Sequence, residues 1–144
     1  MDSYALIPCP SCGAINRVRS DRIDSGPKCA KCKTKLDPTK PQDLTAGNFD
    51  KVVNGSTVPV LVEFYSNGCG ACRSMEPVVN ELARQNPGGL IVAKVNSDRE
   101  PVLHFRFQVM GVPTFVLMKG GREIDRQVGA VPPNNLLAML NKAA

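Results

Sequence analysis

The six cysteines of this 144-residue chain form three pairs, Cys9/Cys12, Cys29/Cys32 and Cys69/Cys72. In each pair two residues separate the partners, so a tight turn can aim both sulfurs at one point. Paired thiols of this kind bind a metal ion, exchange disulfides or pack as small apolar side chains. Four of the six cysteines lie in the first 32 residues and none follows the third pair. Thiol chemistry is therefore confined to two places with different surroundings.

The first two pairs have the spacing of a zinc site. Sixteen residues separate Cys12 from Cys29, which matches the two-knuckle pattern of a tetrahedral four-cysteine centre. Four thiolates leave no open coordination position, so the site would be structural and not catalytic. We expect one zinc ion, held by Cys9, Cys12, Cys29 and Cys32. Free or disulfide-bonded cysteines are the alternative, and we expect no organic cofactor.

Residues 1–36 contain too few apolar side chains to fold unaided. Their aliphatic residues of useful size are Leu6, Ile7, Ile15, Val18, Ile23 and Leu36. So small a core does not stabilise a module of this length, and bound metal would supply the missing free energy. The sequence predicts a zinc-binding module at 1–36, a linker at 37–43 that holds two prolines, and a second domain at 44–144.

The second domain alternates helical patterns with continuous apolar runs. Runs rich in Val, Leu and Ile are typical of strands buried on both faces. Right-handed crossovers between such strands place helices on both sides of a central mixed sheet, which is an α/β fold. The expected elements are a helix at 46–54 capped by Thr45, strand 58–65, helix 69–85, strand 90–96, helix 99–107, a hairpin at 114–128 and helix 134–143.

Cys69 follows a predicted buried strand and begins a predicted helix. Unpaired backbone N–H groups and the positive end of the helix dipole therefore point at its sulfur. Both favour the thiolate, which is the nucleophilic form. Cys72 lies three residues further on, on the same helical face. The sequence predicts a two-step exchange, in which Cys69 attacks a substrate disulfide and Cys72 resolves the mixed disulfide.

Glu63 interrupts the apolar strand that precedes the third pair. A buried carboxyl there would have a pKa raised towards neutrality and could accept the proton of Cys72 during resolution. The alternative is a carboxylate that faces water from a half-exposed strand. The strand pattern does not decide between the two.

Taken together, the strand LVEFY, the Cys-Gly-x-Cys sequence at a helix start and the later Gly-Val-Pro-Thr sequence resemble thioredoxin over residues 44–144. With the four-cysteine module in front, the whole chain is similar to the zinc-containing thioredoxin 2 subfamily. The resemblance implies a thioredoxin fold preceded by a zinc-ribbon-like module. It also implies a protein-disulfide reductase, recycled by an NADPH-dependent thioredoxin reductase or another thiol reductant.

The resemblance assigns roles to residues outside the cysteine pairs. Glu63 corresponds to the family's buried acid, which is normally Asp, and Lys94 to the lysine near it. Pro77 matches the proline that kinks the active-site helix. The family's substrate-binding positions correspond to Gly111 and Val112, the cis-proline position Pro113, and Gly129.

Two departures from the family's usual Trp-Cys-Gly-Pro-Cys sequence adjoin the dithiol. Gly68 replaces the tryptophan and Ala71 the proline, and Tyr65 takes the place of the other family tryptophan. Ala71 adds an N–H donor near Cys69, so we expect a reduction potential above that typical of thioredoxin. A disulfide oxidase or isomerase is one alternative function, and a zinc-ribbon binding module on a thioredoxin scaffold is another.

The net charge of +5 lies mostly in the first module, since residues 1–42 contribute +4. Zinc bound by four thiolates would lower this charge by two, so nucleic-acid binding is not expected. The chain lacks a signal-like start and any stretch of ~20 apolar residues. We therefore expect a cytoplasmic monomer without membrane contact, whose partners are a reductase and disulfide-containing proteins.

Three further residues near the predicted dithiol receive no chemical role. His104 is the only histidine, and a lone histidine on a short helix is usually a surface or packing residue. Met75 and Met110 flank the predicted site, where we expect both to fill apolar gaps.

Overall fold

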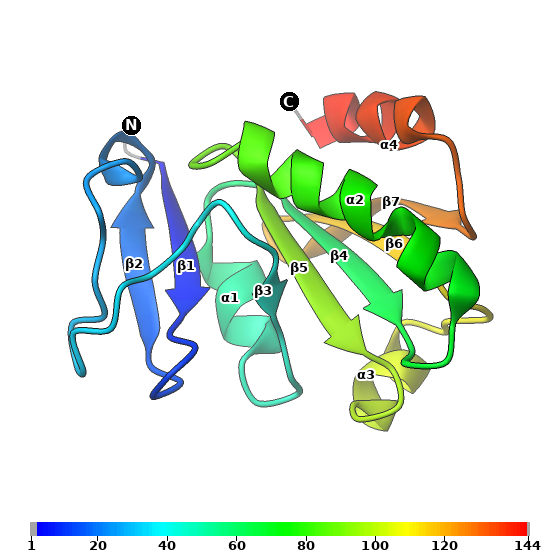
Figure 1. Cartoon of the computed structure of the whole chain (residues 1–144), viewed down its shortest axis with the longest axis horizontal. Helices are drawn as coiled ribbons and strands as arrows, with labels where there is room; N and C mark the ends of the chain where they lie inside the picture. The colour runs from blue at the N-terminus through cyan, green and yellow to red at the C-terminus, as the bar shows by residue number, and fades with distance from the viewer. Residues whose placement is uncertain (1–2, 144) are drawn as a thin grey trace.

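Two antiparallel strands begin the chain in the computed structural model, which describes residues 3–143. β1 (Tyr4–Pro8) pairs with β2 (Ile15–Arg19), and a short 3-10 helix, Ser20–Arg22, follows. Buried and exposed residues alternate from Asn16 to Arg19 in β2, so this strand has one buried and one exposed face. This small sheet lies at one end of the molecule (Figure 1).

A five-stranded mixed sheet forms the centre of the second domain. Its strands lie in the order β3-β5-β4-β6-β7, and the first three run parallel to one another. β6 is antiparallel to β4, and β7 is antiparallel to β6. The bounds are β3 Gln42–Asp43, β4 Val60–Tyr65, β5 Ile91–Asn96, β6 Thr114–Lys119 and β7 Arg122–Val128.

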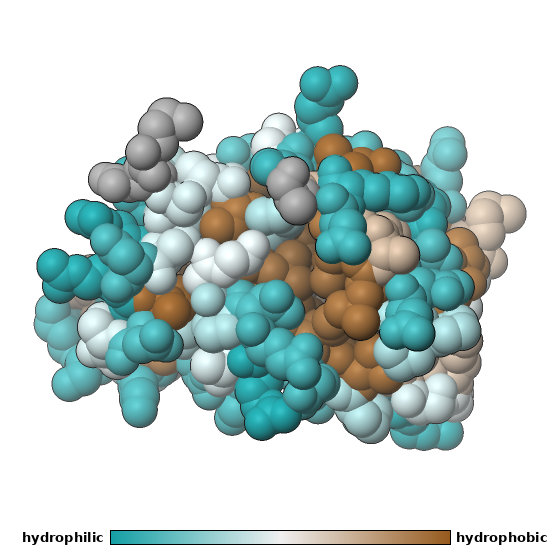
Figure 2. Space-filling view, turned by 90° about the horizontal axis from the view of Figure 1, so that it is seen from above, coloured by the Kyte–Doolittle hydropathy of each residue, from teal (hydrophilic) through white to brown (hydrophobic). Residues whose placement is uncertain are grey.

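Helices cover both faces of this sheet, as the sequence predicts (Figure 1). α1 (Phe49–Gly55) and α3 (Pro101–Arg106) pack on one face. α2 (Gly70–Gln85) and α4 (Pro133–Leu140) pack on the other, followed by a 3-10 turn at Asn141–Ala143. Figure 2 views the molecule from the side of α2 and α4, where apolar side chains gather around the groove between these helices. None of the helices within residues 3–143 has the length and apolar character needed to cross a membrane.

The first helix of the second domain begins later than predicted. Thr45 does not cap it, because the Thr45 hydroxyl accepts a hydrogen bond from Gly47 and its N–H donates to the side chain of Asn48. These local bonds hold 45–48 in a turn, and α1 begins at Phe49. The strand predicted at 58–65 begins at Val60, directly after a proline that has no N–H for the sheet.

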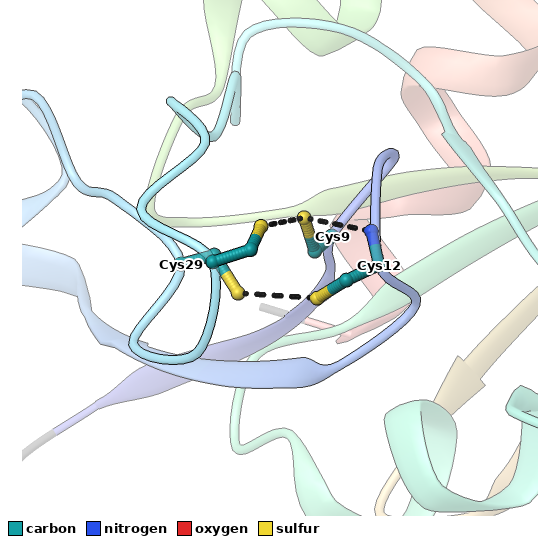
Figure 3. Close-up of side chains that lie close together, drawn as sticks. Cys9, Cys12 and Cys29 are labelled. Carbon is teal, nitrogen blue, oxygen red and sulfur yellow. Dashed lines mark hydrogen bonds between the residues drawn. The ribbon is translucent and has the colours of Figure 1, made fainter.

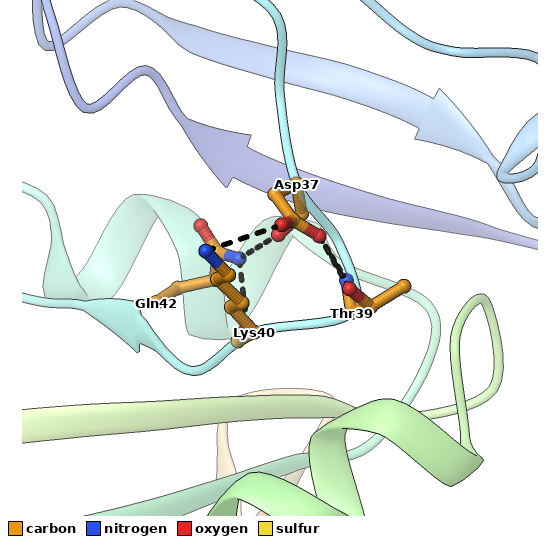
Figure 4. A network of polar contacts seen from close by, with 4 residues as sticks. All are labelled: Asp37, Thr39, Lys40 and Gln42. Atoms are coloured by element: carbon orange, nitrogen blue, oxygen red, sulfur yellow. Dashed lines mark hydrogen bonds and ion pairs between the residues drawn. The ribbon is translucent and has the colours of Figure 1, made fainter.

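The predicted linker is partly ordered into the sheet. Gln42–Asp43 form β3, which pairs with the edge of β5, and a hydrogen bond from Leu44 N–H to the Lys94 carbonyl continues this ladder. The preceding turn is held by Asp37, whose carboxylate accepts hydrogen bonds from the N–H and hydroxyl of Thr39 (Figure 4). The Gln42 amide donates to the Asp37 carbonyl. The connection is therefore short and held at both ends.

The first module and the second domain share one core. Ala5 and Ile7 of β1 belong to the same buried cluster as Phe49 and Val52 of α1. Hydrogen bonds reinforce the contact: Leu6 N–H donates to the Ser56 hydroxyl at 2.9 Å. Packing against the domain therefore adds to whatever stability metal gives the module.

We predict that Ser56→Ala destabilises this junction. Ser56 is 3% exposed, and its removal leaves the Leu6 N–H without its acceptor, at a cost of about 1–2 kcal/mol. Urea denaturation would measure the loss, and amide hydrogen exchange would locate it at Leu6. The exposed Ser25, whose hydroxyl bonds only to the nearby Arg22 carbonyl, provides the control Ser25→Ala. Equal stability of the two variants would contradict the prediction.

Candidate dithiol active site and metal centre

Cys69 and Cys72 lie at the start of α2, joined as a disulfide. Cys69 is the N-cap residue of the helix, with extended backbone angles, and its sulfur accepts a hydrogen bond from the Cys72 N–H at 3.0 Å. This position follows from the fold, because the chain leaves the carboxyl end of β4 and turns into α2 within four residues. The N-terminal N–H groups of a 16-residue helix thus lie beside one sulfur.

The two sulfurs differ in exposure and therefore in role. Cys69 is partly exposed, whereas Cys72 is 4% exposed. No acidic residue occupies the first turn of α2, so nothing there opposes the helix dipole in stabilising a Cys69 thiolate. An accessible thiol at a helix N-terminus, with a buried partner one turn away, is the arrangement that attacks an external disulfide and then resolves it.

The Gly111–Thr114 segment lies against the dithiol. The Val112–Pro113 peptide bond is cis, and the Val112 carbonyl oxygen is 3.6 Å from the Cys69 sulfur. Gly129 N–H donates to the Pro113 carbonyl at 2.8 Å, and the Thr114 hydroxyl donates to the Gly111 carbonyl at 2.5 Å. The structure thus brings all four predicted substrate-binding residues together beside Cys69.

Glu63 is buried, which excludes the water-facing alternative. It is 1% exposed, and neither carboxylate oxygen has a hydrogen-bond partner within residues 3–143. Its neighbours Val62 and Phe64 face the cluster beneath α1 and α3, so strand alternation turns Glu63 towards α2, the helix that carries Cys72. Burial raises the pKa of the Glu63 carboxyl to about 7. A group that titrates there can exchange a proton near neutral pH.

Lys94 stands next to Glu63 in the sheet. The two residues are direct partners in the parallel pairing of β4 with β5. The Lys94 ammonium opposes the effect of burial on the pKa of Glu63, whereas the carboxylate of Glu76 on α2 reinforces it. The Lys94 Nζ atom also lies 4.5 Å from the centroid of the Tyr65 ring. One cation thus acts electrostatically on the buried acid and lies over the aromatic ring at the end of β4.

The residues around Cys69 present little side-chain surface of their own. Gly68 and Ala71 are both exposed, and a Cβ atom placed on Gly68 would meet no other atom within 4 Å. Met75 fills a core position at 4% exposure, as predicted. The same prediction was wrong for Met110, which is 92% exposed because the loop after α3 turns it outward.

The other four cysteines form two knuckles with matching backbone bonds. In the first, Cys9 N–H donates to Ala14 and its carbonyl accepts from Gly13. In the second, Cys29 makes the equivalent bonds with Thr34 and Lys33. Gly13 and Lys33 both have positive φ, +79° and +68°. Each knuckle is therefore the same turn, although only the first has the glycine that this conformation favours.

The geometry of the four sulfurs fits a zinc ion. All four lie within 4.8 Å of one another. Figure 3 shows the Cys12 and Cys29 sulfurs facing each other, 3.6 Å apart, and Cys9 and Cys32 are separated by the same distance. Zinc–sulfur bonds of about 2.3 Å in a tetrahedron require sulfurs about 3.8 Å apart. Backbone N–H groups of Cys32 and Lys31 lower the pKa of the Cys29 thiol to about 6, whereas burial and the neighbouring thiols raise the pKa of Cys12 to about 11.

Asn16 supports this centre, although no motif in the sequence pointed to it. Its side chain accepts a hydrogen bond from Ala30 N–H in the second knuckle at 3.0 Å and donates to the Ala14 carbonyl in the first at 3.2 Å. Asn16 is 8% exposed. The position of Asn16 in β2 could have indicated this role, because a polar amide occupies a buried position in a strand whose residues alternate between buried and exposed.

Comparison with known proteins agrees with this geometry over nearly the whole chain. Residues 40–142 match the thioredoxin family, and residues 8–34 match the zinc ribbon described as Thioredoxin 2, N-terminal. The chain belongs to the thioredoxin family. Thioredoxin C-3 of Corynebacterium nephridii is 36% identical over 126 residues, covering 88% of this chain and 86% of that protein. Thioredoxin 1 of Nostoc sp. is 41% identical over 99 residues, covering 69% and 92% of the two chains.

A solved thioredoxin has the same fold as the second domain. A mutant thioredoxin from Halobacterium salinarum superimposes with a TM-score of 0.68 at 31% identity, covering 75% of this chain and 94% of that one. The thioredoxin fold and a preceding four-cysteine module, both expected from the sequence, are thus confirmed. As a thioredoxin, the chain is a thiol-disulfide oxidoreductase.

The raised pKa of Glu63 predicts a pH-dependent stability. The folded protein holds the Glu63 proton up to about pH 7, and the unfolded chain releases it near pH 4.5, so folding loses about 3 kcal/mol as pH rises through this window. Glu63→Gln removes this dependence and gains stability relative to wild type between pH 5 and pH 8. Urea denaturation at both pH values would measure the difference.

Glu81→Gln is the matched control for this experiment. Glu81 lies half-exposed on α2 with its carboxylate bound to Arg84, which lowers its pKa from the ordinary value, away from this window. The stability of the control relative to wild type should not change between pH 5 and pH 8. A Glu63→Gln variant that behaves like this control would show that Glu63 is ionised throughout.

Proposed function

We propose that this thioredoxin reduces protein disulfides through the Cys69/Cys72 dithiol and is recycled by an NADPH-dependent thioredoxin reductase. The observation that carries the proposal is the position of Cys69, which caps α2 with a partly exposed sulfur 3.6 Å from the Val112 carbonyl. A substrate strand lying along Gly111–Pro113 would bring its disulfide to that sulfur. Binding and attack then occur at one place.

The reaction begins from the reduced dithiol. The Cys69 thiolate attacks one substrate sulfur, forming a mixed disulfide and releasing the other substrate sulfur as a thiolate that takes up a proton. Cys72 then loses its proton and attacks the Cys69 sulfur, which releases the second substrate thiol. Two electrons pass to the substrate, and the Cys69–Cys72 disulfide remains.

Glu63 is the proposed acceptor of the Cys72 proton. Its pKa of about 7 allows it to take a proton at neutral pH and return it to solvent later. Lys94, its partner in the sheet, keeps part of the Glu63 population ionised and thus able to accept. We assign Glu63 and Lys94 to proton transfer, and Gly111, Val112, Pro113 and Gly129 to substrate binding.

The four-cysteine module is proposed to hold one structural zinc ion. Cys9, Cys12, Cys29 and Cys32 would supply four thiolates, and Asn16 would join the two knuckles. A closed thiolate site leaves no position for substrate, so its contribution is to folding. Thiols that bind a metal ion must stay reduced, which fits a reducing compartment, and we propose that the protein is located in the cytoplasm. We also propose that it is a monomer.

Substitution of the two active-site cysteines distinguishes their roles. With NADPH, thioredoxin reductase and insulin, Cys69→Ser should lower turnover at least about a thousandfold, because no nucleophile remains. Cys72→Ser should also stop turnover but accumulate a covalent complex with substrate, visible by mass spectrometry without reductant. If wild-type protein reactivates scrambled ribonuclease efficiently but does not reduce insulin, the site is an isomerase and the reductase proposal fails.

Metal analysis tests the structural zinc ion. The purified protein should contain about one zinc per chain, and Cys12→Ser should lose it, because three thiolates bind the ion far more weakly than four. Removal of the ion by a chelator should increase hydrogen exchange across residues 3–36. Cys72→Ser is the control, since it removes a thiol outside the cluster and should retain the zinc. Equal zinc content in both variants would contradict the assignment.

A further inference from the structure

α3 and the loop that leads from it to Gly111 expose three large apolar side chains. Val102, Phe105 and Met110 are 68%, 77% and 92% exposed, and they fall between positions 102 and 110. Isolated apolar residues on a surface are ordinary, but several together next to a reactive group are typical of a binding surface. We refer to these three residues as the α3 patch.

The fold does not need the α3 patch for its core. α3 already buries Leu103, which is 2% exposed, against the sheet. Phe107, directly after the helix, packs its ring 5.2 Å from that of Phe49 and 5.6 Å from that of Phe64. Because this inward face is complete, Val102 and Phe105 are left on the outer side of α3, where the Phe105 ring packs edge-on against its neighbour His104, with 5.8 Å between the ring centroids.

Phe105 and Met110 also line an open pocket of about 430 Å³. Its other lining residues are His104, Gln108 and Val109, so no Asp, Glu, Lys or Arg contributes to the wall. Gln108 has φ +50°, a left-handed turn that ends α3 and leads to Met110. An uncharged pocket of this size suits one large apolar side chain. Methionine adapts its shape to varied apolar groups, and phenylalanine supplies contact area.

The α3 patch is continuous with the active site. Met110 directly precedes Gly111 and Val112, whose carbonyl lies 3.6 Å from the Cys69 sulfur. On the helix side of the sulfur, Gly68, Gly70 and Ala71 offer no large side chain. Apolar contact next to the nucleophile can therefore come from the loop and α3 on one side, and from Val128 of β7, which lies against Gly111, on the other.

We propose that the α3 patch is a specificity subsite, which binds one large apolar side chain of the disulfide-containing polypeptide that Cys69 attacks. Met110 lies two residues from Val112, so an extended substrate chain would present this side chain about two or three residues from its reacting cysteine. The proposal rests on the disulfide-reductase function and adds a preference among its substrates. It predicts faster reduction of disulfides that have leucine or phenylalanine at those positions.

Two matched peptides test the preference. Each is a linear peptide with one central cysteine, dimerised through its disulfide, and carries either leucine or serine at the second and third positions on both sides. Their rates of reduction by pre-reduced protein, without any reductase, give a leucine-to-serine ratio. We expect a ratio of roughly ten for wild type, in the range that small apolar pockets achieve.

The double variant Phe105→Ser/Met110→Ser should bring this ratio close to one. The control is Ile124→Ser/Leu137→Ser, which removes two exposed apolar side chains from β7 and α4 and should keep the wild-type ratio. Thermal denaturation would confirm that both variants are folded. A wild-type ratio of one, or an unchanged ratio in the Phe105/Met110 variant, would overturn the subsite while leaving the reductase function intact.

Two other outcomes also overturn the proposal. If the Phe105/Met110 variant keeps the peptide ratio but slows NADPH-driven turnover, the α3 patch binds the reductase and not the substrate. If pre-reduced wild type reduces neither peptide nor insulin, the disulfide-reductase function itself fails, and with it the basis of the subsite.

Discussion

The parallel pairing of β4 with β5 is the constraint on which both parts of the active site depend. β4 is the middle strand of the sheet, and its residues from Val60 to Phe64 are each at most 1% exposed. A strand covered on both faces is mostly apolar along its length, and the chain turns only where the strand ends. Beyond that end, Cys69 is the N-cap residue of α2, and its sulfur accepts a hydrogen bond from the Cys72 N–H. The same register places Lys94 beside Glu63.

Burial of a carboxyl in such a strand is unfavourable for the stability of the fold. An apolar residue at position 63 would complete the core without any cost of desolvation. Glu63 instead has two carboxylate oxygens without a partner among the described residues and a pKa of about 7. Folding free energy is therefore given up at Glu63, the residue that we propose accepts the proton of Cys72. Strongly shifted pKa values are more frequent at functional sites than elsewhere in proteins.

Much of the fold followed from residue patterns, because buried strands and long helices impose strict apolar periods. The two-residue β3 is too short to have a period, and its pairing depends on the edge of β5. Turn 45–48 was missed because hydrogen bonds of Thr45 and Asn48 compete with the helix. The exposure of Met110 depends on the turn at Gln108 and cannot be inferred from residue type. Asn16 was detectable in principle, as a polar residue at an inward strand position.

The docking of the first module leaves the dithiol end of the molecule open. β1 and β2 lie at one end of the molecule, whereas the chain turns from β4 into α2 towards the opposite end (Figure 1). The module is fastened to α1 by a shared core and by bonds to Ser56 and Thr57, and β3 shortens its connection. A large protein can thus approach Cys69 without meeting the module. Anything held at the module would remain tethered near the dithiol at high effective concentration, without blocking it.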